Sequence, residues 1–308
     1  MRWGRRCFWE RIYKIRCCSS KMNIKSIKTN LFSMNKILLL IITTIIFFSC
    51  QNENLIVREE PLSLSRSNED FLIFNPVPLE WTFRVLYKRF VKNEFNVNPT
   101  YQNLVAFDEY SESMLLANGH TWFESTPLLK LFAYQVFHAN GGEPIAMGFD
   151  TSLRLDEKEG GVYHLEWGIY FLQAGPGPNF VSRSVFNHEL THIFQHKICK
   201  YTMNVDTEDV IEFEADIITD ALELVCNKGA FPVDSELFAL KDLSSQAKEV
   251  LRQQYLNELV ILVETAGRNS QIVNEFYSKW YKLVYEKEPK ESFQAKALLC
   301  ITSWKHSV

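Results

Sequence analysis

The residues His188-Glu189-Leu190-Thr191-His192 set the expected architecture of this chain, because their order and spacing have a specific meaning on a helix. An α-helix repeats every ~3.6 residues, so residues four apart lie on one face about one turn apart. His188 and His192 are then placed to hold one metal ion between their imidazole rings. Zinc binds nitrogen, oxygen and sulfur ligands at ~2.0–2.3 Å, and its catalytic sites use three protein ligands and a water. Glu189 is placed to act as general base on that water without binding the metal.

A second helix is expected to supply the remaining ligand. Residues 207–226 have apolar side chains mostly at helical spacing, and Glu212 and Asp216 fall four apart on one face of that helix. Glu212 can supply the third, oxygen ligand. Asp216 can accept a hydrogen bond from the free ring nitrogen of a ligand histidine, which fixes the tautomer and orientation of that ring. Glu214 points about 200° around the helix from Glu212, so it is poorly placed to serve the same metal.

The two motifs together resemble the gluzincin branch of the zincin metallopeptidases, in which His-Glu-x-x-His is followed by Glu-x-x-x-Asp on a second helix. The resemblance covers roughly residues 160–226 and implies that Glu212, rather than Glu214, is the third ligand and that Zn2+ is the cofactor. It also implies an α+β, zincin-like fold. In that fold a small sheet has an edge strand before the active-site helix, and the C-terminal half is mostly helical.

Residues 162–172 are predicted to be that strand, because they are rich in β-branched and aromatic side chains and glycines lie on both sides. A bulge is expected at Gly168. In zincins a peptide substrate lies along the edge strand through main-chain hydrogen bonds. The resemblance therefore implies a peptide or protein substrate, and an ordinary sheet strand without a substrate role is the alternative.

Other polar residues near the motifs have less defined roles. His188 and His196 would lie about 12 Å apart along the helix axis, so we interpret His196 as a polar residue at the helix end. Peptide hydrolysis also needs a group that stabilises the oxyanion. Tyr201, His164 and Tyr170 are of suitable types, and the sequence does not choose among them.

The remaining chain is expected to form one domain over residues 76–308, with helices and strands before the motif helix and helices after it. Ser182 or Ser184 is the expected N-cap of the motif helix. The other expected elements are a strand at 146–155 and helices at 81–93, 127–138, 235–265 with a break near Ser244, 270–286 and 290–304.

The N-terminal residues are expected to be a targeting signal rather than part of the fold. Met34-Asn35-Lys36 is followed by an apolar run to Phe48 and then by Ser49 and Cys50. This pattern resembles a bacterial lipoprotein signal over residues 34–49, in which Cys50 becomes the lipidated first residue. Residues 1–33 are either a mis-assigned start or a basic extension, and residues 50–75 are a polar, flexible tether. The resemblance implies an exported protein anchored by lipid to a membrane, which we take to be the bacterial outer membrane.

The charge balance changes when this signal is removed. Residues 1–49 contain ten Lys or Arg and one Glu, which leaves 23 basic and 36 acidic residues in the remaining chain. A net charge of about −13 argues against nucleic acid as a partner. It mildly favours basic substrates or partners.

The cysteine count after the signal limits disulfide bonding. Cys199, Cys226 and Cys300 follow Cys50, so these three cannot all pair with one another. A bridge between Cys199 and Cys226 is one alternative, and free cysteines buried as small hydrophobic residues are the other.

Two principal functions follow from these patterns. The first is a zinc-dependent metallopeptidase in which Glu189 is the catalytic base, His188, His192 and Glu212 bind the metal, and Asp216 orients a ligand. The alternative is a non-catalytic lipoprotein that uses the zinc scaffold to bind a peptide, glycan or protein at the cell surface. A structural surface lipoprotein with an incidental motif is a third class. The sequence does not specify the oligomeric state.

Overall fold

The computed structural model describes residues 75–91, 102–124, 126–153, 160–173, 181–202, 204, 207–226, 237, 243–290 and 292–305. All of them belong to one compact unit. The predictions for residues 1–33, the signal at 34–49 and the lipidation of Cys50 lie outside these residues, as does nearly all of the tether. None of the helices within the described ranges is both long and apolar enough to cross a bilayer.

A small mixed sheet forms around the central strand β3 (Ile145–Asp150), all six residues of which are buried. Strand β1 (Tyr87–Arg89) pairs in parallel with the first half of β3, and β2 (Leu104–Ala106) pairs antiparallel with its second half. Strand β5 (Gly168–Phe171) also pairs with β3 in parallel, and β4 (Gly161–His164) pairs antiparallel with β5. In the path β1-β3-β5-β4, the strand β4 therefore lies at one end.

The predicted single strand over residues 162–172 is wrong, because the chain turns back on itself there. His164 pairs with Gly168, and the Trp167 amide donates to the His164 carbonyl at 3.1 Å, so β4 and β5 form a tight hairpin. Gly168 has a φ of +113°, which side-chain-bearing residues rarely adopt. A Cβ atom there would also lie 2.1 Å from the Ala146 carbonyl oxygen. The glycine expected to mark a bulge instead begins the second strand of a hairpin.

In the part of the chain that the structure describes, three helices precede the central strand: α2 (Phe83–Leu86), α3 (Glu109–Glu124) and α4 (Pro127–Ala139). Helix α4 confirms the helix predicted at 127–138, and it begins at the Thr126 N-cap with a proline in its first turn. The helix predicted at 81–93 is wrong beyond Leu86, because the chain then extends to pair with β3 as β1. Helix α3 was not predicted, and the predicted strand at 146–155 is shorter, as β3.

The second half of the described chain is helical, as predicted: α5 (Arg183–Lys197), α6 (Glu208–Cys226), α7 (Ser245–Thr265), α8 (Ser270–Tyr285) and α9 (Lys296–Lys305). Ser182 is the N-cap of α5, with its hydroxyl accepting from the Val185 amide at 3.2 Å. Ser244 caps α7 in the same way, which places the expected break at the start of that helix. The architecture is thus α+β, with a small mixed sheet and a mostly helical C-terminal half.

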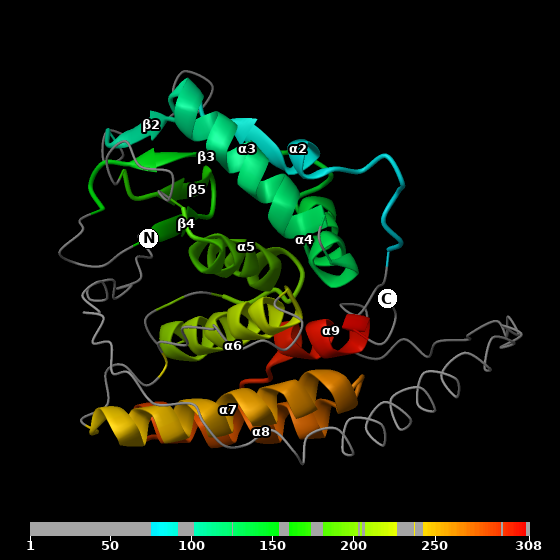
Figure 1. Ribbon diagram of the computed structural model, residues 1–308, viewed down its shortest axis with the longest axis vertical. Helices are drawn as coiled ribbons and strands as arrows, with labels where there is room; N and C mark the ends of the chain where they lie inside the picture. Colours follow the sequence, from blue (N-terminus) through cyan, green and yellow to red (C-terminus); the bar gives the residue numbers. More distant parts are fainter. Residues whose placement is uncertain are drawn as a thin grey trace, which may run out of the picture. The chain divides into compact units, whose positions relative to one another are not determined.

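Helix α5 lies between the sheet and α6, and α7 and α8 lie on the far side of α6 (Figure 1). An aromatic cluster holds the N-terminal half of α5 against the elements that precede it. The Phe186 ring is fully buried and lies within 6.1 Å, centroid to centroid, of four other rings, which are those of Phe83, Trp122, Phe123 and Phe171. Such packing fixes the rotation of α5, and with it the face that the two histidines occupy.

Candidate metal centre

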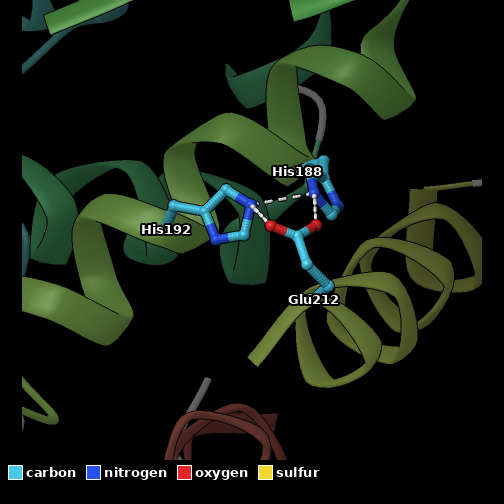
Figure 2. A group of neighbouring side chains, drawn as sticks. All are labelled: His188, His192 and Glu212. Atoms are coloured by element: carbon cyan, nitrogen blue, oxygen red, sulfur yellow. Dashed lines mark hydrogen bonds and ion pairs between the residues drawn. The ribbon is translucent and has the colours of Figure 1, made fainter. Parts of the chain in front are cut away.

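Helices α5 and α6 bring the three predicted ligands together (Figure 2). His188 Nε2 lies 2.9 Å from His192 Nε2 and 3.1 Å from Glu212 Oε2. His192 Nε2 lies 3.2 Å from Glu212 Oε1. Among the described residues, these side chains form the group of three suited to hold a metal ion.

The spacing of these atoms fits a tetrahedral metal. Ligand atoms ~2.0–2.1 Å from a tetrahedral zinc lie about 3.3 Å from one another. The two Nε2 atoms lie 2.9 Å apart, and each lies 3.1 or 3.2 Å from one of the two oxygens of the Glu212 carboxylate, which is close to that value. Both histidines are 2 % exposed, and the Glu212 side chain is 20 % exposed, so the group opens to solvent on the side of the carboxylate. Imidazole and carboxylate together are a donor set typical of zinc.

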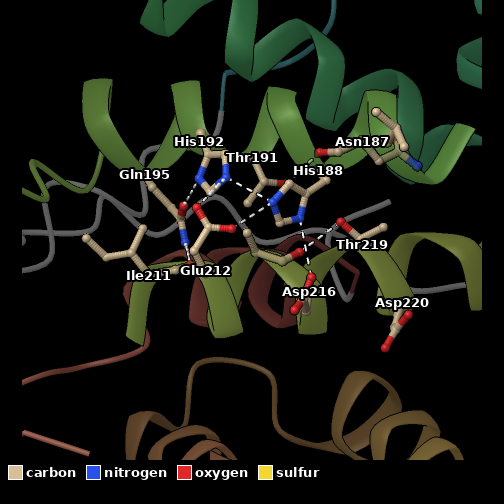
Figure 3. Close-up of polar contacts among 12 residues, drawn as sticks. Asn187, His188, Thr191, His192, Gln195, Ile211, Glu212, Asp216, Thr219 and Asp220 are labelled. Atoms are coloured by element: carbon tan, nitrogen blue, oxygen red, sulfur yellow. Dashed lines mark hydrogen bonds and ion pairs between the residues drawn. The ribbon is translucent and has the colours of Figure 1, made fainter. Parts of the chain in front are cut away.

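The other ring nitrogen of each histidine faces a polar side chain (Figure 3). His188 Nδ1 lies 3.4 Å from Asp216 Oδ1, so the predicted orienting residue is next to the predicted ligand. His192 Nδ1 lies 3.0 Å from the amide oxygen of Gln195. Acceptors at both Nδ1 atoms favour the tautomer that presents a lone pair on Nε2, where the metal group converges.

The role of Gln195 was missed in the sequence, although its position three residues after His192 places both on one helix face. The Gln195 amide nitrogen donates to the Ile211 carbonyl at 3.0 Å and to Glu214 Oε2 at 2.9 Å. Glu214 is therefore turned away from the metal group, as its angular position on the helix predicts. Burial raises the pKa of Glu214 to about 7, although hydrogen bonds from Gln195, the Leu298 amide and Tyr201 act in the opposite direction.

The charges within the group favour a cation. Burial acts to raise the pKa of Glu212, but the attraction of His192 and hydrogen bonds from both histidines outweigh it and hold that pKa well below its ordinary value. Burial acts to lower the pKa of His192, yet the carboxylates of Glu212 and Glu189 raise it. A carboxylate that stays ionised beside two ring nitrogens is the state that a divalent metal needs.

The side chain of Glu189 lies on the face of α5 that packs against the edge strand β4. A Cβ atom on Gly161 would come within 3.1 Å of Glu189 Cγ and 3.3 Å of Glu189 Oε1. The Glu189 carboxyl group therefore occupies space that the missing side chain of Gly161 leaves open. This contact places the predicted base beside the backbone of β4.

His196 is half-buried at the end of α5, and its Nδ1 lies 3.4 Å from the Tyr163 hydroxyl. Burial lowers the pKa of His196, and the nearby Lys197 and Lys200 lower it further. His196 is not part of the three-residue metal group found among the described residues. This position agrees with its interpretation as a polar residue at the helix end.

The three residues considered for the oxyanion have polar partners of their own. The Tyr201 hydroxyl donates to the Gln294 carbonyl at 2.6 Å, and the Tyr170 hydroxyl donates to the Trp167 carbonyl at 2.8 Å. His164 Nε2 lies 3.8 Å from the buried Asp150 carboxylate. These contacts give none of the three a position at the metal group, and the oxyanion role stays unassigned.

The structure describes two cysteine side chains, and neither forms a disulfide bond. Cys199 and Cys300 are both buried free thiols, and they share a hydrogen bond with each other. The Cys226 side chain lies outside the description. Cys199 thus agrees with the alternative in which it is a small buried hydrophobic residue.

No protein family, curated protein or solved structure matches the chain. The function must therefore be inferred from the motifs and the geometry of the site.

Proposed function

We propose that this protein is a zinc-dependent metallopeptidase of the zincin type. The observation that carries the proposal is the convergence of His188 Nε2, His192 Nε2 and the Glu212 carboxylate at close to the spacing of a tetrahedral site, with the Glu189 carboxylate near enough to raise the pKa of His192. An incidental pair of surface histidines would not be buried or share a third ligand from another helix. The proposed zincin-like fold has support from the order of elements, because an antiparallel edge strand and β5 directly precede α5.

The residues of the chain have separate roles in the proposed reaction. Bound zinc would supply Lewis acidity at the scissile carbonyl and make a nearby water more acidic. The Glu189 carboxylate accepts a proton from the attacking water and then delivers it to the leaving amine nitrogen. Asp216 and Gln195 hold the rings of His188 and His192 so that Nε2 faces the metal.

The edge strand β4 is the proposed site for the peptide backbone. It pairs with β5 on one side, and a Cβ atom on its Gly161 would lie 3.3 Å from Glu189 Oε1. An extended peptide added to such an edge makes main-chain hydrogen bonds that do not depend on its side chains. That arrangement would bring a scissile bond close to the base.

Metal analysis of the purified chain is the first test. We expect about one zinc per chain. Loss of a ligand should weaken zinc binding at least as much as loss of a residue that orients a ligand, so we expect Glu212→Ala to bind zinc at least ~10–100-fold more weakly. A chain that takes up no zinc when the metal is supplied would refute the proposal.

Turnover is the second test, on a library of quenched fluorescent peptides. We expect Glu189→Gln to keep zinc and to lose hydrolysis, because the amide cannot accept the proton. Zinc binding without hydrolysis of any peptide, together with tight stoichiometric ligand binding, would instead favour the non-catalytic binding lipoprotein.

We also propose that the protein is exported and anchored to a membrane by lipid on Cys50. The support is the sequence alone, namely the apolar run that ends at Ser49-Cys50. Labelling of cells with a fatty-acid analogue should modify the full chain and should not modify Cys50→Ser. Equal labelling of both proteins would show that this cysteine is not the site.

A further inference from the structure

A buried chain of hydrogen bonds connects the ligand His192 to the C-terminal helix α9. His192 Nδ1 faces Gln195 Oε1 at 3.0 Å, and Gln195 Nε2 donates to Glu214 Oε2 at 2.9 Å. Glu214 Oε1 accepts from the Leu298 amide at 3.1 Å. His192 and Gln195 come from α5, Glu214 comes from α6, and Leu298 lies in the first turn of α9, so three helices contribute to the chain.

The surroundings of Gln195 allow only one orientation of its amide. The amide nitrogen faces two acceptors, the Ile211 carbonyl at 3.0 Å and Glu214 Oε2 at 2.9 Å. In the flipped amide, an oxygen would face the Ile211 carbonyl oxygen, and neither atom has a proton to share. The amide oxygen is therefore fixed toward His192, and His192 must have its proton on Nδ1 to donate to it. In this tautomer Nε2 can offer its lone pair to a metal ion on the side where Glu212 and His188 lie.

Glu214 is held in turn by the N-terminus of α9. The first amides of a helix have no partner within the helix, and a carboxylate is stabilised there by the helix dipole. Glu214 accepts from the amides of Ala297 and Leu298 and thus caps α9 from another helix. Tyr201 fixes the same turn, because its hydroxyl accepts from the Lys296 amide at 2.8 Å. Glu214 is fully buried, so it cannot exchange these partners for water.

We propose that Gln195 and Glu214 are positioning residues that hold His192 in its metal-binding tautomer, and that the docking of α9 sets the zinc affinity of the site. The proposal rests on the zinc site of the proposed function and does not depend on turnover. Its consequence is that helix α9, which supplies none of the three proposed ligands, contributes to metal binding.

The central experiment compares Gln195→Met with a matched control, Gln135→Met. Gln135 is also buried, at 2 % exposure against 0 % for Gln195, and donates one hydrogen bond to the Asn75 carbonyl at 3.0 Å. Zinc affinity is measured on the full chain by competition with a chelating dye. Partners of ligand histidines typically contribute 10–100-fold to metal affinity, so we expect a loss of ~10–100-fold for Gln195→Met and less than ~3-fold for Gln135→Met.

The absorption bands of the cobalt-substituted protein provide a second readout, because their position and intensity report the ligand geometry. If Gln195 had only a structural role, Gln195→Met would behave like Gln135→Met: the thermal midpoint would fall, and the cobalt spectrum would not change. We expect the spectrum to change in Gln195→Met and to remain that of the wild type in Gln135→Met.

Glu214→Gln is a milder change in the same series of hydrogen bonds, and it provides the test if Gln195→Met does not fold. The new amide group has two possible orientations. In one, its nitrogen faces the Gln195 amide nitrogen. In the other, its oxygen turns toward Gln195 and leaves the amides of α9 without an acceptor. Either change loosens the hold on His192, so we expect a similar loss of zinc affinity. Gln195 and Glu214 act through one series of hydrogen bonds. The double variant should therefore bind zinc no more than ~3-fold more weakly than whichever single variant has the lower zinc affinity.

The outcomes separate this proposal from the peptidase proposal. Wild-type zinc affinity and an unchanged cobalt spectrum in Gln195→Met, or in Glu214→Gln if that variant alone folds, would overturn the positioning role and leave the zinc site standing. Weaker zinc binding in these variants of a chain that hydrolyses no peptide would support the positioning role and remove the peptidase. A wild-type chain without zinc affinity would overturn both.

Discussion

Replacement of Gly161 by alanine should displace the Glu189 carboxylate without disturbing the metal ligands. The new Cβ would lie 3.1 Å from Glu189 Cγ and 3.0 Å from Val185 Cγ1. Ordinary contacts between carbon atoms lie at ~3.5–4.0 Å, so Glu189 must move by about 0.4–0.9 Å. A misplacement of about 1 Å in a catalytic group can cost ~100-fold in rate, and roughly half that shift corresponds to about 10-fold. We therefore expect kcat to fall by about 10-fold, which is about 1.4 kcal/mol of transition-state stabilisation.

The matched control is Gly160→Ala. Its Cβ would lie 2.7 Å from Val185 Cγ2, and its three nearest neighbours are all atoms of Val185. Overpacking of this kind costs ~1–3 kcal/mol of stability, so Gly160→Ala should be destabilised at least as much as Gly161→Ala and should keep most of its kcat.

Three measurements on the purified variants decide the outcome: zinc per chain, kcat on a cleaved peptide and the free energy of unfolding in urea. Zinc content should be that of the wild type in both variants. Equal loss of kcat in both would show that a general shift of α5, rather than the Glu189 carboxylate, limits the reaction. Unchanged kcat in Gly161→Ala, with no hydrolysis by Glu189→Gln, would refute the inferred position of the base.

Three further outcomes are expected. Asp216→Ala should weaken zinc binding by ~10–100-fold in a chelator competition, because His188 loses the partner at its Nδ1, and unchanged affinity would contradict that role. Phe186→Ala should lower the free energy of unfolding by ~3–5 kcal/mol in urea, since the ring is fully buried in the aromatic cluster, and a loss below 1 kcal/mol would refute that packing. Burial acts to raise the pKa of Asp150, but hydrogen bonds from His164, Ser152 and Asn103 hold it below its ordinary value. The ionised Asp150 carboxylate therefore stabilises the fold fully above the unfolded-state pKa of ~3.9, and this contribution is lost as the pH falls toward the folded-state pKa. The difference in unfolding free energy between the wild type and Asp150→Asn should thus shrink below about pH 4.

The sequence predicts helices well where local signals act alone. Helices α4, α5, α7 and α8 combine apolar spacing with a polar N-cap residue, and each begins at that cap. The grouping of His188, His192 and Glu212 also follows from spacing, because each motif places its residues on one helix face and α5 packs on α6.

The sequence fails where a distant partner decides the conformation. The residues after Leu86 have a helical pattern, but they extend because β3 offers a neighbouring strand for pairing. The hairpin β4–β5 is hidden in a continuous run of strand-forming residues, and its main signal is one glycine with positive φ. Gln195 and Glu214 were not recognised as partners because their contact depends on the packing of α5 against α6 and on the capping of α9.

The placement of all three candidate ligands on two consecutive helices has a consequence for the order in which the protein forms. His188 and Glu212 are 24 residues apart, whereas the amide of Leu298 is 84 residues from the Glu214 carboxylate that it contacts. Short loops close at a lower entropic cost, so α5 can pack on α6 before α9 docks. The three candidate ligands therefore come together without α9. In terms of the proposed zinc site, a folding chain would first bind metal weakly through α5 and α6, and the docking of α9 would then tighten the site.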